Sequence, residues 1–168
     1  MSALTTGLAG SFETALAFVG LSALSGFVAA LAMDLPMVSQ EEGFTPAYVA
    51  ASILRGTDPN EVSAFDAHVV HHGAGVLAGV LYAAVYWMLA AVVPPVVAAG
   101  PISLVPHALA TAAVVGFVYT VFAHVVLPRG AERVYEERST AVRGQWLRSS
   151  FVFGLTLAVV LPLLTAGL

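Results

Sequence analysis

Residues 67–93 read AHVVHHGAGVLAGVLYAAVYWMLAAVV, an apolar run that contains no Asp, Glu, Lys or Arg and opens on a group of histidines. A helix of about 20 residues crosses the roughly 30 Å hydrocarbon core of a bilayer, and this run exceeds that length. Its apolar residues are continuous rather than alternating, which disfavours a transmembrane β-strand. Because a helix satisfies its own backbone hydrogen bonds in lipid, the stretch predicts a transmembrane helix.

Three further runs have the same character, so we predict transmembrane helices over residues 12–33, 67–93, 104–127 and 148–166. The chain has 168 residues, of which 59% are hydrophobic and 10% charged, and its mean hydropathy is +0.90. Soluble domains carry about 25% charged residues, so this chain has too few charges to cover a surface that faces water. The predicted fold class is therefore a single all-α domain in the lipid bilayer, a bundle of four transmembrane helices.

All the basic residues are arginines, and they lie in two of the predicted connections. Arg55 lies in the connection 34–66, and the others lie in or directly after the connection 128–147: Arg129, Arg133, Arg138, Arg143 and Arg148. Positively charged connections mark the cytoplasmic side of a membrane protein. We therefore expect a multi-pass protein of the plasma membrane with both termini outside. The arginines form no patch of the nucleic-acid-binding type, and the absence of cysteine excludes thiolate chemistry.

The first long connection contains signals for surface helices. Thr45-Pro46 before an apolar segment and Gly56 after it predict a short helix with Thr45 as its N-cap. Asp58 to Glu61 reads DPNE, a capping box that predicts a second helix start at Pro59. If this helix ran unbroken into the next span, its first two turns would stand out in the cytoplasm. The polar connection 128–147 predicts another short helix on the membrane surface.

A weak internal repeat is visible between the two halves of the chain. Gly26-Phe27-Val28 recurs as Gly116-Phe117-Val118, and the same offset places Asp34 opposite His124. This pattern indicates two weakly repeated helical hairpins, with Asp34 and His124 at one depth near the cytoplasmic face.

The histidines at the start of the second span are the strongest candidates for a binding site. His68 lies three residues before His71 and four before His72, and these spacings place the imidazoles on one side of a helix. Asp34 and His124 are expected at the same level of the bundle. Imidazoles and carboxylates bind zinc, copper and iron, so these five residues are candidate ligands of a divalent metal ion.

Haem b is an alternative cofactor for the same region. Two of His68, His72 and His124 would ligate its iron from facing helices, with Gly75 and Gly79 leaving room for the ring. A third alternative needs no cofactor, because intramembrane histidines also form hydrogen bonds between helices or to lipid headgroups. The sequence leaves these alternatives open.

The glycines predict where helices pack together. Gly75 and Gly79 form a GxxxG pattern, and Gly26 belongs to a similar stripe in the first span. Small residues let helix backbones approach closely. Such faces pack within a bundle or against another subunit, so we expect a homo-oligomer or a subunit of a membrane complex.

Three sequence features together resemble a known family. The first span is rich in glycine and ends near Met33, the second contains His72-x-x-Gly75-x-x-x-Gly79-x-x-Tyr82, and the third contains Gly116 and closes on Pro128. In these features the chain resembles the YagU-like group of small inner-membrane proteins of bacteria and archaea. The resemblance covers the first three spans and implies a four-helix membrane bundle, but it brings no catalytic residues with it.

The sequence contains no complete catalytic constellation, so the leading functional hypothesis is a non-enzymatic structural or accessory protein of a membrane assembly. The alternative is a haem- or metal-binding protein that serves electron transfer through the histidine group. A third hypothesis is a transporter of protons or small solutes. His107 and His124 would mark the two ends of its path, about 25 Å apart along one helix, but few polar residues lie between them.

Overall fold

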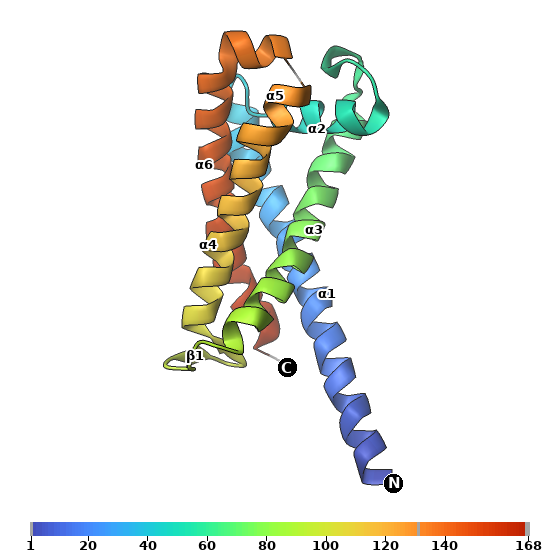
Figure 1. Cartoon of the computed structure of the whole chain (residues 1–168), viewed down its shortest axis with the longest axis vertical. Helices are drawn as coiled ribbons and strands as arrows, with labels where there is room; N and C mark the ends of the chain where they lie inside the picture. Colours follow the sequence, from blue (N-terminus) through green and yellow to red (C-terminus); the bar gives the residue numbers. More distant parts are fainter. Residues whose placement is uncertain (1, 131, 167–168) are drawn as a thin grey trace.

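Four long helices run up and down the molecule in the computed structural model, which describes residues 2–130 and 132–166 (Figure 1). They are α1 (Ser2–Ser39), α3 (Ala64–Ala90), α4 (Leu104–Val121) and α6 (Glu132–Thr165). Within the described residues, four helical segments are long and apolar enough to cross a membrane: 13–39, 64–90, 104–130 and 136–165. The prediction of an all-α bundle of four transmembrane helices is confirmed.

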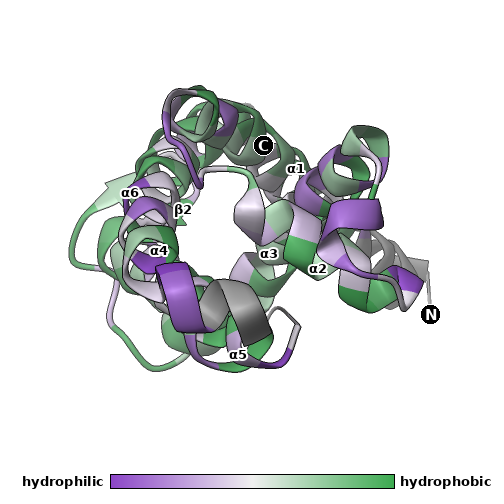
Figure 2. Ribbon diagram, turned by 90° about the horizontal axis from the view of Figure 1, so that it is seen from above, coloured by the Kyte–Doolittle hydropathy of each residue, from purple (hydrophilic) through white to green (hydrophobic). Residues whose placement is uncertain are grey.

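Both termini lie at one end of the bundle, and the arginine-bearing connections lie at the other (Figure 1). Viewed from that second end, hydrophilic residues gather on the connecting segments, whereas the long helices behind them are mostly hydrophobic (Figure 2). The end that carries α2 (Thr45–Arg55) and α5 (Leu127–Gly130) is called the arginine end below. The opposite end is closed by a small hairpin, in which β1 (Ala98–Ala99) pairs antiparallel with β2 (Ile102–Ser103).

The first helix does not end at Met33, as the sequence analysis expected, but continues to Ser39. Pro36 is compatible with this extension because its fixed φ suits a helix and it removes only one backbone hydrogen bond. Its own carbonyl accepts hydrogen bonds from the Ser39 hydroxyl at 2.9 Å and from the Gln40 side-chain amide at 2.8 Å. As a result, Asp34 projects from a regular helix rather than from a loop.

The surface helix α2 forms where it was predicted, but with a different cap. Phe44, not Thr45, is the N-cap, and the Thr45 hydroxyl instead donates a hydrogen bond to Glu42 at 2.6 Å. The predicted glycine stop is confirmed, because Gly56 adopts the left-handed conformation with φ +68°.

A helical turn begins at Pro59, as predicted, but it does not run unbroken into the second span. The Asp58 carboxylate accepts the N–H of Asn60 and closes only one 3-10 turn, η1 (Pro59–Glu61). The backbone is then extended at Ser63, whose hydroxyl oxygen accepts the N–H of Asp66 at 3.0 Å and caps α3. The effective helix start is therefore Ser63, which the sequence analysis did not single out.

The third span contains a wider turn, the π-helix η2 (Phe122–Val126), before it continues into α5. Pro128 accounts for the irregularity, because it has no N–H to donate to the preceding turn. The N–H of Leu127 bonds to the carbonyl of Phe122, and the carbonyl of Ala123 instead accepts a hydrogen bond from Arg143 on α6 at 3.1 Å.

The connection after this span also differs from the prediction. The expected short surface helix is not separate but forms the first turns of α6, so the fourth helix begins at Glu132 rather than near Arg148.

A glycine contact joins α1 to α3. A Cβ atom added to Gly26 would lie 2.2 Å from the carbonyl oxygen of Gly75, and one added to Gly79 would lie 2.1 Å from the carbonyl oxygen of Ser22. These neighbours are backbone atoms, which cannot move aside without separating the helices. The three glycines therefore set the distance between α1 and α3.

Glu42 links the loop after α1 to α6. Its carboxylate accepts hydrogen bonds from Thr45 and, at 2.6 Å, from Arg138, and its backbone N–H donates to the Gln145 side chain at 2.7 Å. The pKa of Glu42 lies below the ordinary value of 4.5. The largest cause is the hydrogen bond from Thr45, and the hydrogen bond and positive charge of Arg138 lower the pKa further, whereas burial opposes both.

The glycine contact predicts a position-specific loss of stability. Gly79→Ala should lower the free energy of unfolding by about 1–3 kcal/mol, because the new methyl group overlaps the α1 backbone. Thermal unfolding in detergent micelles, followed by circular dichroism, measures the change. Gly73→Ala on the same helix is the control, since a Cβ there meets no described atom within 4 Å apart from its chain neighbours and its own helix backbone. Equal melting temperatures for the two variants would contradict the contact.

Glu42 predicts a pH-dependent stability. A carboxyl group whose pKa is lowered on folding stabilises the folded state above its unfolded pKa, and this contribution disappears as the pH falls through the folded pKa. Glu42→Gln should therefore lower the free energy of unfolding by about 1 kcal/mol at pH 7. The difference from the parent protein should shrink once the pH drops below 4.5. Glu41→Gln, at an exposed neighbour, should change little, and an equal effect of both variants would refute the role of Glu42.

Candidate metal centre

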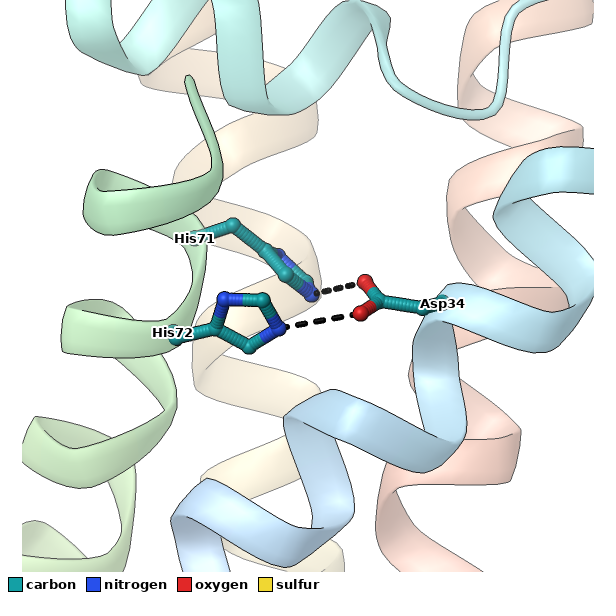
Figure 3. Close-up of side chains that lie close together, drawn as sticks. All are labelled: Asp34, His71 and His72. Atoms are coloured by element: carbon teal, nitrogen blue, oxygen red, sulfur yellow. Dashed lines mark hydrogen bonds and ion pairs between the residues drawn. The ribbon is translucent and has the colours of Figure 1, made fainter. Parts of the chain in front are cut away.

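Asp34 on α1 faces the imidazoles of two consecutive histidines of α3 (Figure 3). His72 Nε2 is 2.9 Å from Asp34 Oδ2, and His71 Nε2 is 3.2 Å from Asp34 Oδ1. His71 Nε2 also lies 3.3 Å from the carbonyl oxygen of Ala30, one turn before Asp34. One potential ligand atom from each of Asp34, His71 and His72 lies within 4.8 Å of the other two. These three residues are called the Asp34 trio below.

Helix packing explains how one short side chain reaches both histidines. Consecutive helical residues point about 100° apart, so His71 and His72 diverge from the α3 axis. Only a group that approaches close to that axis can contact both. The glycine contact, which includes Gly75 one turn beyond the histidines, brings the α1 backbone near enough for Asp34 to do so.

His68, which the spacing argument placed with the other two, lies outside the trio. Its Nδ1 is 2.8 Å from the carbonyl oxygen of Ala64, to which it donates a hydrogen bond. Its exposed ring lies against Phe44, with 4.9 Å between ring centroids, and 6.0 Å from the ring of His72. His68 therefore borders the trio without contributing a ligand atom to it.

His124 is not brought to the trio either. It lies in the π-helix, is exposed, and makes an edge contact with Tyr119 at a centroid distance of 6.4 Å. Within the described residues, the group with ligand atoms in mutual reach consists of Asp34, His71 and His72. The repeat alignment of Asp34 with His124 thus does not put the two side chains in one site.

The expectation that Gly75 and Gly79 leave room for a haem ring is wrong. A Cβ at Gly75 would lie 2.6 Å from the side chain of Ala30, and a Cβ at Gly79 would meet the α1 backbone. The space beside these glycines is filled by α1.

The donor set and its spacing suit a transition-metal ion. Two ligands that are each about 2.0–2.1 Å from a tetrahedral zinc ion lie about 3.3 Å from each other, close to the separation of His71 Nε2 and Asp34 Oδ1. Two imidazoles and one carboxylate form the ligand set of several zinc and iron(II) sites that keep a coordination position open. Asp34 Oδ1 is buried, and its contact with His71 Nε2 at 3.2 Å lacks hydrogen-bond geometry, so among the described residues this oxygen accepts no hydrogen bond.

Access and charge are consistent with such an ion. The side chain of His71 is 6% exposed, but those of His72 and Asp34 are 18% and 24% exposed, so the trio is open on one side. Asp34 lies in a segment able to span the membrane, where an uncompensated carboxylate is costly. A bound dication compensates this charge, as does a proton shared with the histidines.

A second buried histidine lies toward the hairpin end. His107 Nε2 donates to the carbonyl oxygen of Ala158 at 3.0 Å, so its Nδ1 is left to accept the hydroxyl hydrogen of Tyr82 at 2.5 Å. Both ring nitrogens of His107 are thus used in linking α3, α4 and α6. This role is structural, and the sequence analysis missed the partner Tyr82.

Comparison with known proteins brings no relative: no family model, no curated protein and no solved structure matches the chain. The resemblance to the YagU-like group stays a prediction.

The buried hydrogen bond between Tyr82 and His107 predicts a loss of stability when the Tyr82 hydroxyl is removed. Tyr82→Phe should lower the free energy of unfolding by about 1–3 kcal/mol, because His107 Nδ1 loses its donor in a buried site. Tyr119→Phe, on a half-buried ring, is the control and should have a smaller effect. Chemical unfolding of both variants in micelles measures the difference in the free energy of unfolding. Equal effects would show that the hydrogen bond between Tyr82 and His107 contributes no more to stability than the hydroxyl of Tyr119.

Proposed function

We propose that this integral membrane protein binds one divalent transition-metal ion at the Asp34 trio. The observation that carries the proposal is the convergence of two imidazole nitrogens and one carboxylate from two different helices. Three protein ligands and an open position are typical of zinc, and of iron(II), in sites that accept a further small ligand. The ion would tie α1 to α3 at the depth where the glycine contact already holds them together.

This proposal combines two of the hypotheses from the sequence. In the predicted accessory protein, the metal ion would link two helices of the bundle. We prefer a metal ion to haem as the cofactor, because α1 packs against Gly75 and Gly79 and fills the space that a haem ring would need. We further propose that the arginine end faces the cytoplasm of a plasma-membrane protein, with both termini outside. The ion would then reach the trio from the cytoplasmic side, through the partly exposed side chains of His72 and Asp34.

The oligomer and the larger membrane complex predicted from the sequence remain proposals as well. The small-residue faces on which they rested are used, at Gly26, Gly75 and Gly79, for packing inside the bundle. A transporter role has less support, because His107 is held by Tyr82 and Ala158 and does not face His124.

Metal titration tests the proposal. Purified protein, stripped with a chelator in detergent, should bind one Zn²⁺ per chain by isothermal titration calorimetry. Co²⁺ should give the visible absorption bands of a low-coordinate site. Asp34→Asn and His72→Ala should each weaken binding by tenfold or more, since each removes one of three ligands. His68→Ala and His124→Ala are matched controls that should bind like the parent protein.

The controls separate the metal centre from a hydrogen-bonded contact. If wild type binds no ion saturably, or if Asp34→Asn retains full affinity, the trio is only a link between α1 and α3. Weakened binding in His68→Ala alone would move the site to the exposed face of α3 and would equally refute the proposed ligands.

A further inference from the structure

A cleft opens between α3 and α4. The two helices meet near the hairpin and diverge toward the arginine end (Figure 1). The cleft has a volume of about 290 Å³ and is lined largely by apolar side chains, among them Leu77, Leu81, Phe117, Val121, Phe122 and Val126. Its lining on α3 runs from Val70 to Leu81, which corresponds to about 16 Å along a helix.

A smaller chamber of about 70 Å³ lies on the inner side of this cleft. The two spaces share the walls formed by His71, Ala78, Val118 and Trp146, and the chamber extends to Met33 on α1 and Ser150 on α6. Together their volumes slightly exceed the lower limit of about 300 Å³ that is usual for ligand pockets. The inner end of the cleft is therefore large enough for a narrow, extended group.

Two buried donors line the chamber without a partner. Trp146 Nε1 and Ser150 Oγ have no hydrogen-bond acceptor in the part of the chain that the structure describes, although their residues are only 8% and 2% exposed. An indole N–H can only donate, and a buried donor without an acceptor is costly. The chamber therefore lacks an acceptor oxygen, which an incoming molecule would supply.

The position of the cleft indicates where that molecule comes from. At the arginine end, Pro46, Ala47 and Ala50 of α2 cover the cleft. At its side, Leu77 and Phe117 are 69% and 56% exposed on helices long enough to span the membrane. The open side thus faces lipid rather than water. Trp146 lies two residues before Arg148, a position typical of the membrane interface, where lipid ester groups lie.

We propose that the cleft binds one fatty acyl chain of a bilayer phospholipid. The chain lies between α3 and α4, and its ester carbonyl oxygen accepts hydrogen bonds from Trp146 Nε1 and Ser150 Oγ. This site adjoins the Asp34 trio through His71 but requires no metal ion, so it stands independently of the proposed function.

Lipids that differ only in the carbonyl group test this site. Delipidated protein in detergent is titrated with dioleoylphosphatidylcholine and with its diether analogue, which has the same chains but no ester oxygen. Trp87→Phe leaves Trp146 as the single tryptophan, because the chain has two. We expect a saturable change in Trp146 fluorescence and one retained lipid per chain by native mass spectrometry. The ester lipid should bind at least tenfold more tightly than the ether.

Two variants then test whether Trp146 and Ser150 donate the hydrogen bonds to the ester carbonyl. Trp146→Phe keeps an aromatic ring but removes the N–H, and Ser150→Ala removes the hydroxyl. In native mass spectrometry, both should lose the preference for the ester. Ser149→Ala is the matched control, since it removes a neighbouring hydroxyl of α6 that lines neither the chamber nor the cleft, and it should keep the preference for the ester.

Three results would overturn the proposal. The first is equal affinity of the wild type for ester and ether lipids, a comparison that needs no folded variant. The second is retention of the ester preference in Trp146→Phe. The third is a dimer that forms in place of the lipid-bound monomer, which would assign the cleft to a second copy of the chain.

Discussion

The approach of α1 to α3 at three glycines is the constraint on which the rest of the structure depends. At Gly26, Gly75 and Gly79 the helix backbones touch, and a single added methyl group would overlap backbone atoms. In lipid, helices associate mainly through such packing, because the surrounding chains are as apolar as the side chains. The contact also determines the chemistry one turn away, since Asp34 reaches both His71 and His72 only while the helices are this close.

Polar groups inside the bundle need hydrogen-bond partners within the protein, because the same apolar environment offers them none. Both ring nitrogens of His107 form hydrogen bonds. The carbonyl of Ala123, which has no backbone partner at the π-helix, accepts a hydrogen bond from Arg143. Several other buried hydroxyls also lack a partner among the described residues. What distinguishes Trp146 and Ser150 is that both line the chamber on the inner side of the cleft. The chain therefore carries two different kinds of site, a polar trio near the arginine end and an apolar cleft beside it.

Individual positions show where sequence reasoning succeeded and where it could not. Gly56 was recognisable as a helix stop because a left-handed residue after a helix is a local requirement that glycine meets. Pro36 did not mark the end of α1, because the helix continues through it to Ser39. The DPNE motif did not mark the start of a long helix, because a capping box can also close a single turn. The true cap at Ser63 is equally local, because its hydroxyl accepts the N–H of Asp66, but the nearby DPNE motif was the more conspicuous signal.

By itself, the sequence determined the four apolar helices that are able to span a membrane and the end of the bundle at which the arginines lie. These features are local, because span length, apolar composition and charge placement act on each segment separately. Only the tertiary structure decided that Asp34 joins His71 and His72 rather than His68 or His124, and that Trp146 and Ser150 line one chamber. Helical spacing gives the direction of a side chain around its own helix, whereas the helix that it faces depends on the packing of the whole bundle.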